Sequence, residues 1–114
     1  MENCLFCKII KGEIPSACVY EDEHVYAFRD IAPQAPEHIL VVPKDHIPSV
    51  SDINEGNSLL AAKCFETIAK IADTMNLKSG YRVITNNGAD AGQTVLHLHF
   101  HVLGGKPLGT VLVK

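Results

Sequence analysis

The chain has 114 residues, of which 46% are hydrophobic and 20% are charged, and its 10 Lys and Arg against 13 Asp and Glu give a formal net charge of -3. This length suits a single domain over residues 1–114, which can bury roughly two-thirds of the surface that its unfolded chain exposes. The acidic balance argues against nonspecific nucleic-acid binding, because such binding needs a basic surface that neutralises phosphates.

The sequence carries no signal for a membrane or for secretion. Its longest apolar runs have four residues, far fewer than the ~20 that span a bilayer, and the acidic N-terminus does not begin a signal peptide. We therefore expect a cytoplasmic protein without a membrane partner. In a reducing cytoplasm the Cys-x-x-Cys spacing of Cys4 and Cys7 predicts a metal or redox motif. Cys18 and Cys64 are expected to be ordinary buried thiols.

The first half of the chain predicts a short helix and three strands. The helix is expected over residues 4–11, where a glycine follows the apolar run. Two β-prone runs, 17–21 and 25–29, flank a turn at residues 22–24 and predict a hairpin. The third strand is expected over 38–42, and its continuous apolar run predicts burial on both faces of a sheet.

The second half predicts one long helix and two further strands. The helix is expected to begin at Asp52, with Glu55 three residues later as in a capping box. The strands are expected over 81–85 and 97–103. One face of the helix carries an apolar stripe of Leu60, Cys64, Ile68, Ile71 and Met75. These elements predict an α+β domain with a mostly antiparallel five-stranded sheet, one long helix and one short helix.

The strand over 97–103 carries the most informative pattern in the chain. Because strand side chains alternate between faces, three imidazoles share one face and three apolar side chains share the other. The imidazoles are those of His97, His99 and His101, and the apolar side chains are those of Leu98, Phe100 and Val102. Three histidines at strict period two indicate a functional site.

Two chemistries can use such a row. The first is one catalytic zinc held by all three imidazoles, but His97 and His101 would start roughly 13 Å apart along the strand while Zn–N bonds are about 2 Å long. The second gives the imidazoles separate tasks around a phosphorus atom. An unprotonated imidazole is a good nucleophile near pH 7, and a neighbouring imidazole can donate a hydrogen bond to the phosphoryl oxygens or the leaving group. The geometry favours the second chemistry.

The segment before the histidine strand predicts a phosphate-binding loop. Residues 86–92 contain two glycines, which let the backbone approach a ligand and turn its N–H groups toward an anion. Thr94 follows and can add a hydroxyl group. An Asn-Gly turn alone is ordinary hairpin material, so the prediction depends on the loop's position directly before the histidines.

These residues resemble the histidine triad (HIT) superfamily, and in particular its Hint branch. The segment 97–103 fits the family's pattern of three histidines alternating with apolar residues, and the likeness extends from about Cys4 to Gly105. Further matching segments are Phe28-Arg29-Asp30-Ile31, Pro33-Gln34-Ala35-Pro36-Glu37-His38, Val42-Pro43-Lys44-Asp45-His46 and Gly92-Gln93-Thr94.

The resemblance implies a homodimeric hydrolase with a HIT-like fold that acts on purine nucleoside phosphoramidates and related AMP or GMP conjugates. It implies that His99 attacks phosphorus and forms a nucleotidyl-histidine intermediate, which water then cleaves. His101 would contact the phosphate and assist the leaving group, and the main chain of His97 would orient the nucleophile. His38 would lie behind the triad as a hydrogen-bond partner. No cofactor is required for this chemistry.

The resemblance also implies how the nucleotide is bound. Asp30 would hold the ribose hydroxyls, since a carboxylate can accept both hydrogen bonds of a vicinal diol, and Phe28 and Ile31 would line the base pocket. The phosphate would be surrounded by Asn86, Gly92, Gln93 and Thr94, together with His99 and His101. Thr94 stands where Hint proteins often have Ser, which keeps the hydroxyl. The chain after residue 105 lacks the Trp-containing tail of many Hint proteins, which leaves the preferred amine open.

A structural zinc ion is a further implication. Cys4 and Cys7 alone make half of a tetrahedral site, and some HIT proteins with a similar Cys-x-x-Cys complete it with two histidines. Those histidines correspond here to His46 and His97. A Cys2His2 set is a closed structural site with no open position for substrate. The alternative of a redox pair is disfavoured, because the chain lacks a thioredoxin-like βαβ pattern.

Two other functions remain open from the sequence. One is a zinc-dependent hydrolase that uses the triad as metal ligands. The other is a dimeric nucleotide-binding or scaffold protein without catalysis, which the intact triad disfavours.

Overall fold

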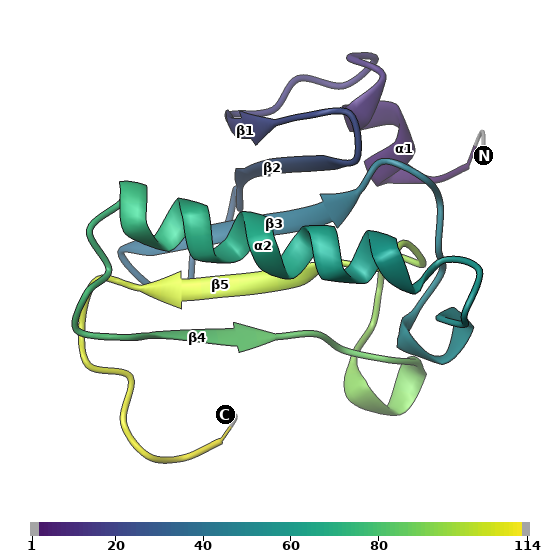
Figure 1. The fold of residues 1–114 in the computed structure, drawn as a ribbon. Coiled ribbons are helices and arrows are strands. Elements are labelled where there is room, and N and C mark those ends of the chain that lie inside the picture. The colour runs from purple at the N-terminus through teal and green to yellow at the C-terminus, as the bar shows by residue number, and fades with distance from the viewer. Residues whose placement is uncertain (1–2, 113–114) are drawn as a thin grey trace.

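An antiparallel sheet lies at the centre of the structure, a computed structural model that describes residues 3–112 (Figure 1). Its strands are β1 (Cys18–Glu21), β2 (Val25–Arg29), β3 (Glu37–Pro43), β4 (Tyr81–Ile84) and β5 (Phe100–Gly104). They lie in the order β1-β2-β3-β5-β4, and every neighbouring pair is antiparallel. The α+β class and the five-stranded sheet are therefore confirmed.

The two helices cover opposite faces of this sheet. Helix α2 (Ser58–Thr74) buries the apolar stripe that includes Cys64 and Ile68 against inward-facing residues of β2, β3 and β5. Helix α1 (Leu5–Ile10) buries Phe6 against the other face of β2 and β3. Figure 1 shows α2 lying over the sheet, with its axis roughly along the strands. Strand β3 is buried on both faces, as its apolar run predicted. Neither helix within residues 3–112 is long and apolar enough to cross a bilayer.

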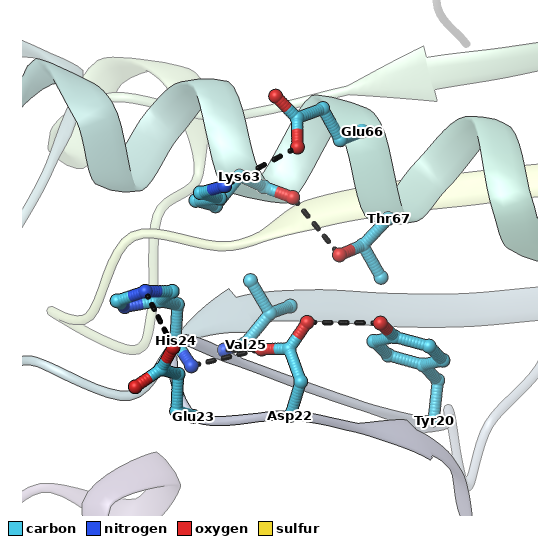
Figure 2. Close-up of polar contacts among 8 residues, drawn as sticks. All are labelled: Tyr20, Asp22, Glu23, His24, Val25, Lys63, Glu66 and Thr67. Carbon is cyan, nitrogen blue, oxygen red and sulfur yellow. Dashed lines mark hydrogen bonds and ion pairs between the residues drawn. The ribbon is translucent and has the colours of Figure 1, made fainter.

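The turn between β1 and β2 is fixed by one carboxylate. Asp22 Oδ1 accepts hydrogen bonds from the backbone N–H groups of His24 and Val25 at 2.8 and 2.9 Å, and Oδ2 accepts one from the Tyr20 hydroxyl at 2.9 Å (Figure 2). Burial alone would raise the pKa of Asp22, but these hydrogen bonds outweigh it and lower the pKa. The predicted hairpin is confirmed, and it positions the end of β2 where Phe28 lies.

The expected start of the long helix is wrong. Helix α2 begins at Ser58, whereas Asp52 belongs to a short 3-10 turn and its carboxylate accepts a hydrogen bond from the Ser49 hydroxyl at 2.7 Å. The amide oxygens of Asn54 and Asn57 bind nearby backbone N–H groups, each at 2.8 Å. Short polar side chains compete for backbone groups in this way and favour turns over helix.

The prediction that Cys18 is buried is also wrong. Cys18 lies on the edge strand β1, beside an irregularity in the register with β2, and it is exposed. Cys64 is buried as expected, and burial raises the pKa of its thiol to about 12. Such a thiol is unreactive at neutral pH.

Candidate active site and metal centre

The histidine motif begins before the strand that was expected to carry it. Regular strand β5 starts at Phe100, three residues later than predicted, and β4 ends at Ile84, one residue earlier. The segment ahead of β5 is held by other bonds: Leu98 N–H donates to the Ile47 carbonyl at 2.6 Å. The alternation still holds, because the three apolar side chains Leu98, Phe100 and Val102 pack in the α2 core. The histidines therefore face the side that α1 covers.

His97 belongs to a sulfur-containing cluster. Its Nδ1 lies 3.3 Å from Cys4 Sγ, 3.6 Å from Cys7 Sγ and 3.2 Å from His46 Nδ1. Cys7 Sγ lies 3.4 Å from His46 Nδ1, and the four ligand atoms all lie within 4.8 Å of one another. The structure thus brings together the four residues predicted as metal ligands, in a group that could bind a metal ion.

The protonation of His97 suits this cluster. Its Nε2 lies 2.8 Å from the Pro43 carbonyl oxygen, which can only accept, so Nε2 carries the hydrogen. Nδ1 therefore presents its lone pair to Cys4, Cys7 and His46. Complete burial of the side chain lowers the pKa of His97 to about 4, which keeps the ring neutral.

His99 is oriented by the backbone of its own segment. Its Nδ1 donates a hydrogen bond to the His97 carbonyl at 2.7 Å, so that the neutral ring carries its hydrogen on Nδ1 and a lone pair on Nε2. The Phe6 ring packs edge-on against the imidazole, with centroids 5.0 Å apart, and the Thr85 hydroxyl donates to the His99 carbonyl at 2.8 Å. The lone pair is thereby placed on Nε2, and the ring is held in position.

His101 belongs to a second cluster, on the other side of His99. Gln34 N–H donates to His38 Nδ1 at 3.0 Å, so the neutral His38 ring carries its hydrogen on Nε2. That Nε2 lies 2.9 Å from His101 Nδ1, which must then accept. The hydrogen of His101 is left on Nε2, as a donor. Burial lowers the pKa of His101 to about 4 and also lowers that of His38.

Asp30 lies beside this second cluster. Its Oδ1 accepts a hydrogen bond from Ala32 N–H at 2.8 Å, and its Oδ2 lies 3.5 Å from His38 Nε2. Phe28, predicted to line the base pocket, is buried with its ring 5.5 Å from that of Phe6. Ile31, predicted for the same pocket, is fully exposed.

The predicted phosphate loop is internally braced. Gln93 is buried, its amide oxygen accepts from Gly88 N–H at 2.9 Å, and its Nε2 donates to the Pro48 carbonyl at 2.7 Å. Because the oxygen and the nitrogen of this amide are both hydrogen-bonded within the protein, the Gln93 side chain stabilises the loop. Gly92 has φ +81°, which a residue with a side chain rarely adopts. Thr94 is exposed.

A cavity of about 570 Å³ opens over the second cluster. His38, His101 and Asn86 line it, together with residues of β4 and of the segment after β5. In the sheet, His101 pairs with Leu40 of β3 on one side and with Ile84 of β4 on the other. The structure thus forms two clusters around the triad, as the resemblance implied: a closed cluster, whose four ligand atoms face one another (Cys4, Cys7, His46 and His97), and an open cluster under the cavity (Asp30, His38 and His101).

Several functional groups were missed by the sequence reasoning. The carbonyl of Pro43 and the N–H of Gln34 set the tautomers of His97 and His38, the Thr85 hydroxyl holds the backbone at His99, and Phe6 packs on its ring. Backbone donors and acceptors carry no sequence signal. Phe6 had one weak signal, because it is one of the two apolar residues between Cys4 and Cys7; the other, Leu5, is exposed.

Known proteins resemble this chain along nearly its whole length. A purine nucleoside phosphoramidase of Escherichia coli is 46% identical over 112 residues, which cover 97% of this chain and 94% of that protein. A HIT family hydrolase structure from Clostridium thermocellum superposes with a TM-score of 0.97 at 49% identity and covers 99% of both chains. A histidine triad protein structure from Clostridium difficile gives a TM-score of 0.94 at 48% identity, with 97% of both chains covered.

The family model of the HIT domain matches residues 11–108. This match covers most of the chain, including β1 to β5 and the three triad histidines. The chain belongs to the HIT family.

Proposed function

We propose that this protein is a hydrolase that cleaves purine nucleoside phosphoramidates, or related AMP and GMP conjugates, through a nucleotidyl-His99 intermediate. The observation that carries the proposal is the 2.7 Å hydrogen bond from His99 Nδ1 to the His97 carbonyl, because it leaves Nε2 as the nucleophile. The relative in Escherichia coli that bears the name purine nucleoside phosphoramidase supports the substrate class.

The chemistry follows from the two fixed rings. His99 Nε2 forms a bond to phosphorus while the phosphorus–nitrogen bond of the substrate breaks, and the departing nitrogen takes up a proton from water and leaves as the amine. His101 Nε2–H lies on the neighbouring ring, with centroids 5.1 Å apart, and donates a hydrogen bond to the phosphoryl oxygen or to the departing nitrogen. Water then attacks the phosphorus and releases the nucleotide and His99. Preorganised donors of this kind stabilise the charge that develops in a loose phosphoryl transition state.

The nucleoside is bound on the β2 side of the triad. Asp30, held by Ala32 N–H, accepts hydrogen bonds from the ribose hydroxyls. Phe28 forms the buried wall of the base pocket and the fully exposed Ile31 covers its rim on binding. Asn86 and Thr94 donate to the phosphate.

The residues of the closed cluster fit a structural zinc ion. Tetrahedral bonds of about 2.0–2.1 Å to nitrogen and about 2.3 Å to sulfur place ligand atoms about 3.3–3.8 Å apart. The distances around His97 Nδ1 are 3.2–3.6 Å, and hydrogen bonds cannot explain all three, because that nitrogen carries no hydrogen and has a single lone pair with which to accept. Cys4, Cys7, His46 and His97 would hold the ion. It would tie α1 to the sheet and supply no chemistry to the reaction.

This arrangement argues against a zinc hydrolase that uses the triad as ligands. His97 and His101 fall into different clusters among the described residues, with His99 between them. The scaffold alternative is weakened by the fixed tautomers, because a protein that only binds nucleotides has no use for a free Nε2 at His99.

We further propose that the protein acts as a homodimer in the cytoplasm. Strand β4 lies at an edge of the sheet and leaves Tyr81 and Val83 exposed, and the α2 residue Phe65 is also exposed. A second copy that packs here would remove these apolar side chains from water and would cover the unpaired backbone groups of the strand edge. A reducing compartment keeps Cys4 and Cys7 available as metal ligands.

A turnover assay tests the proposal. The protein should release AMP from adenosine 5'-phosphoramidate, and His99→Asn should abolish the release while AMP still binds. His24→Asn is the matched control, because His24 lies in the β1–β2 turn outside both clusters. Tight AMP binding without turnover in the unmodified protein would contradict the proposal and favour the scaffold function.

A further inference from the structure

The cavity over His101 extends away from the proposed nucleoside site. Asp30 N–H donates to the His38 carbonyl, so the ribose-binding residue lies beside β3 on the β2 side of the sheet. His38 pairs with Leu103 of β5, and Leu103 pairs with Arg82 of β4. Since neighbouring strands are about 4.8 Å apart, Arg82 and Asp30 lie on opposite sides of the triad.

The charge of the cavity differs between these two sides. The described residues that line it include Arg82 and Lys106 but no carboxylate. Asp30 approaches the site from the nucleoside side, where its Oδ2 lies 3.5 Å from His38 Nε2. The β4 end of the cavity lining therefore carries two cationic side chains, in a protein whose overall formal charge is -3.

Arg82 is positioned and still has donors to offer. Its Nη2 donates to the Gly109 carbonyl at 3.0 Å, which holds the guanidinium beside the segment that follows β5. A guanidinium has five N–H groups, so most of them remain for a ligand. Lys106 lies on that segment and lines the same cavity.

We infer that Arg82 and Lys106 form a subsite for a negatively charged leaving group, such as an amine that carries a carboxylate. The inference rests on the proposed function and names the substrate class of that site. With the nucleoside on the β2 side and phosphorus at His99 and His101, the remaining substituent on phosphorus extends toward β4. In the net reaction the phosphorus–nitrogen bond breaks, the OH of one water passes to phosphorus, and its other hydrogen passes to the nitrogen. The amine leaves with its carboxylate unchanged.

Matched substrate pairs provide the test. Adenosine 5'-phosphoramidates of glycine and β-alanine are compared with those of glycinamide and β-alaninamide, which keep the shape and lack the charge. We expect kcat/KM to favour the acids by about tenfold or more, because hydrogen bonds to charged groups are the stronger ones. The double variant Arg82→Gln with Lys106→Gln should bring the acid-to-amide ratio close to one. Lys78→Gln, at an exposed lysine outside the cavity lining, should keep the ratio unchanged.

The acid-to-amide ratio of kcat/KM distinguishes a change in specificity from damage to the fold. Gln at position 82 keeps an N–H for the Gly109 carbonyl, and a general loss of structure would lower both rates together. A ratio near one in the unmodified protein, or a high ratio that survives in the double variant, would overturn the subsite while leaving the proposed function intact. If none of the four compounds is cleaved, the proposed function fails and the subsite fails with it.

Discussion

The two ends of the histidine triad lie four residues apart and have opposite surroundings. His97 is completely buried, and its Nδ1 faces two thiols and a second imidazole. His101 is partly exposed, its Nδ1 accepts from His38, and its Nε2–H is left for the cavity. The motif supplies identical side chains, and the contacts from distant segments decide that one suits a metal and the other suits a substrate.

The largest effect is expected from damage to the closed cluster. Cys7→Ser removes one ligand from the proposed zinc site, and we expect a loss of about 3 kcal/mol or more in the free energy of unfolding, since metal binding contributes directly to folding. Urea denaturation and a metal analysis of the purified protein measure this. Cys18→Ser is the matched control, because that thiol is exposed on an edge strand.

Activity measurements on the same variant distinguish a structural metal ion from a catalytic one. Cys7→Ser molecules that remain folded should keep their activity, because the ion has no part in the chemistry. A chelator that stops turnover and leaves the fold intact would instead place the metal in the reaction. A purified protein without metal, with Cys7→Ser as stable as Cys18→Ser, would remove the structural zinc from the account.

The open cluster is tested through His38. His38→Leu removes the donor to His101 Nδ1, so that the hydrogen of the His101 ring is no longer fixed on Nε2. We expect kcat to fall by about 10- to 100-fold, by analogy with the loss of hydrogen-bond partners that orient metal-ligating histidines. His38→Gln keeps an N–H group near the same position and should retain more of the rate. If Leu and Gln variants of equal stability show equal rates, the hydrogen bond between His38 and His101 does not orient the reaction.

The last prediction concerns the dependence of stability on pH. Burial, with smaller contributions from His99 and His38, lowers the pKa of His101 to about 4 in the folded protein, while the nearby Asp30 opposes the shift. The unfolded chain, with a His pKa of about 6.5, therefore binds the proton first as the pH falls. Stability from this group is present above pH 6.5 and is lost between about pH 6.5 and 4. Denaturant midpoints across this window should fall less steeply in His101→Asn, and an unchanged slope would contradict the assignment.

Much of the fold could be predicted because its signals are local. The hairpin turn depends on Asp22, which binds the N–H groups of the residues just after it, and the buried strand β3 is a continuous apolar run. The start of α2 could not be placed, because Asp52 and Asn57 can each cap a helix or stabilise a turn. The tertiary contacts of the turn decide between them, as when Asn87 accepts from Ser51 N–H at 2.8 Å.

The resemblance implied both the grouping of His97 with Cys4, Cys7 and His46 and the place of His38 behind the triad, whereas residue spacing by itself implied neither. The spacing of the histidines indicates a shared face, but only the fold brings Cys4 and His46 to one end and His38 to the other. The tautomers depend on the Pro43 carbonyl and the Gln34 N–H. Every residue type has a backbone carbonyl, and every type except proline has a backbone N–H, so neither group can be recognised in the sequence. For this reason the sequence alone left the zinc hydrolase open.

The most direct test of the central claim is to trap the covalent intermediate. The protein is mixed with an adenosine 5'-phosphoramidate labelled in its phosphorus, quenched within the first turnover under conditions that preserve phosphorus–nitrogen bonds, and digested for peptide mass spectrometry. The account predicts an adenylylated peptide with the modification on His99 Nε2. A label on another side chain, or rapid release of product with no labelled peptide at any time, would contradict it.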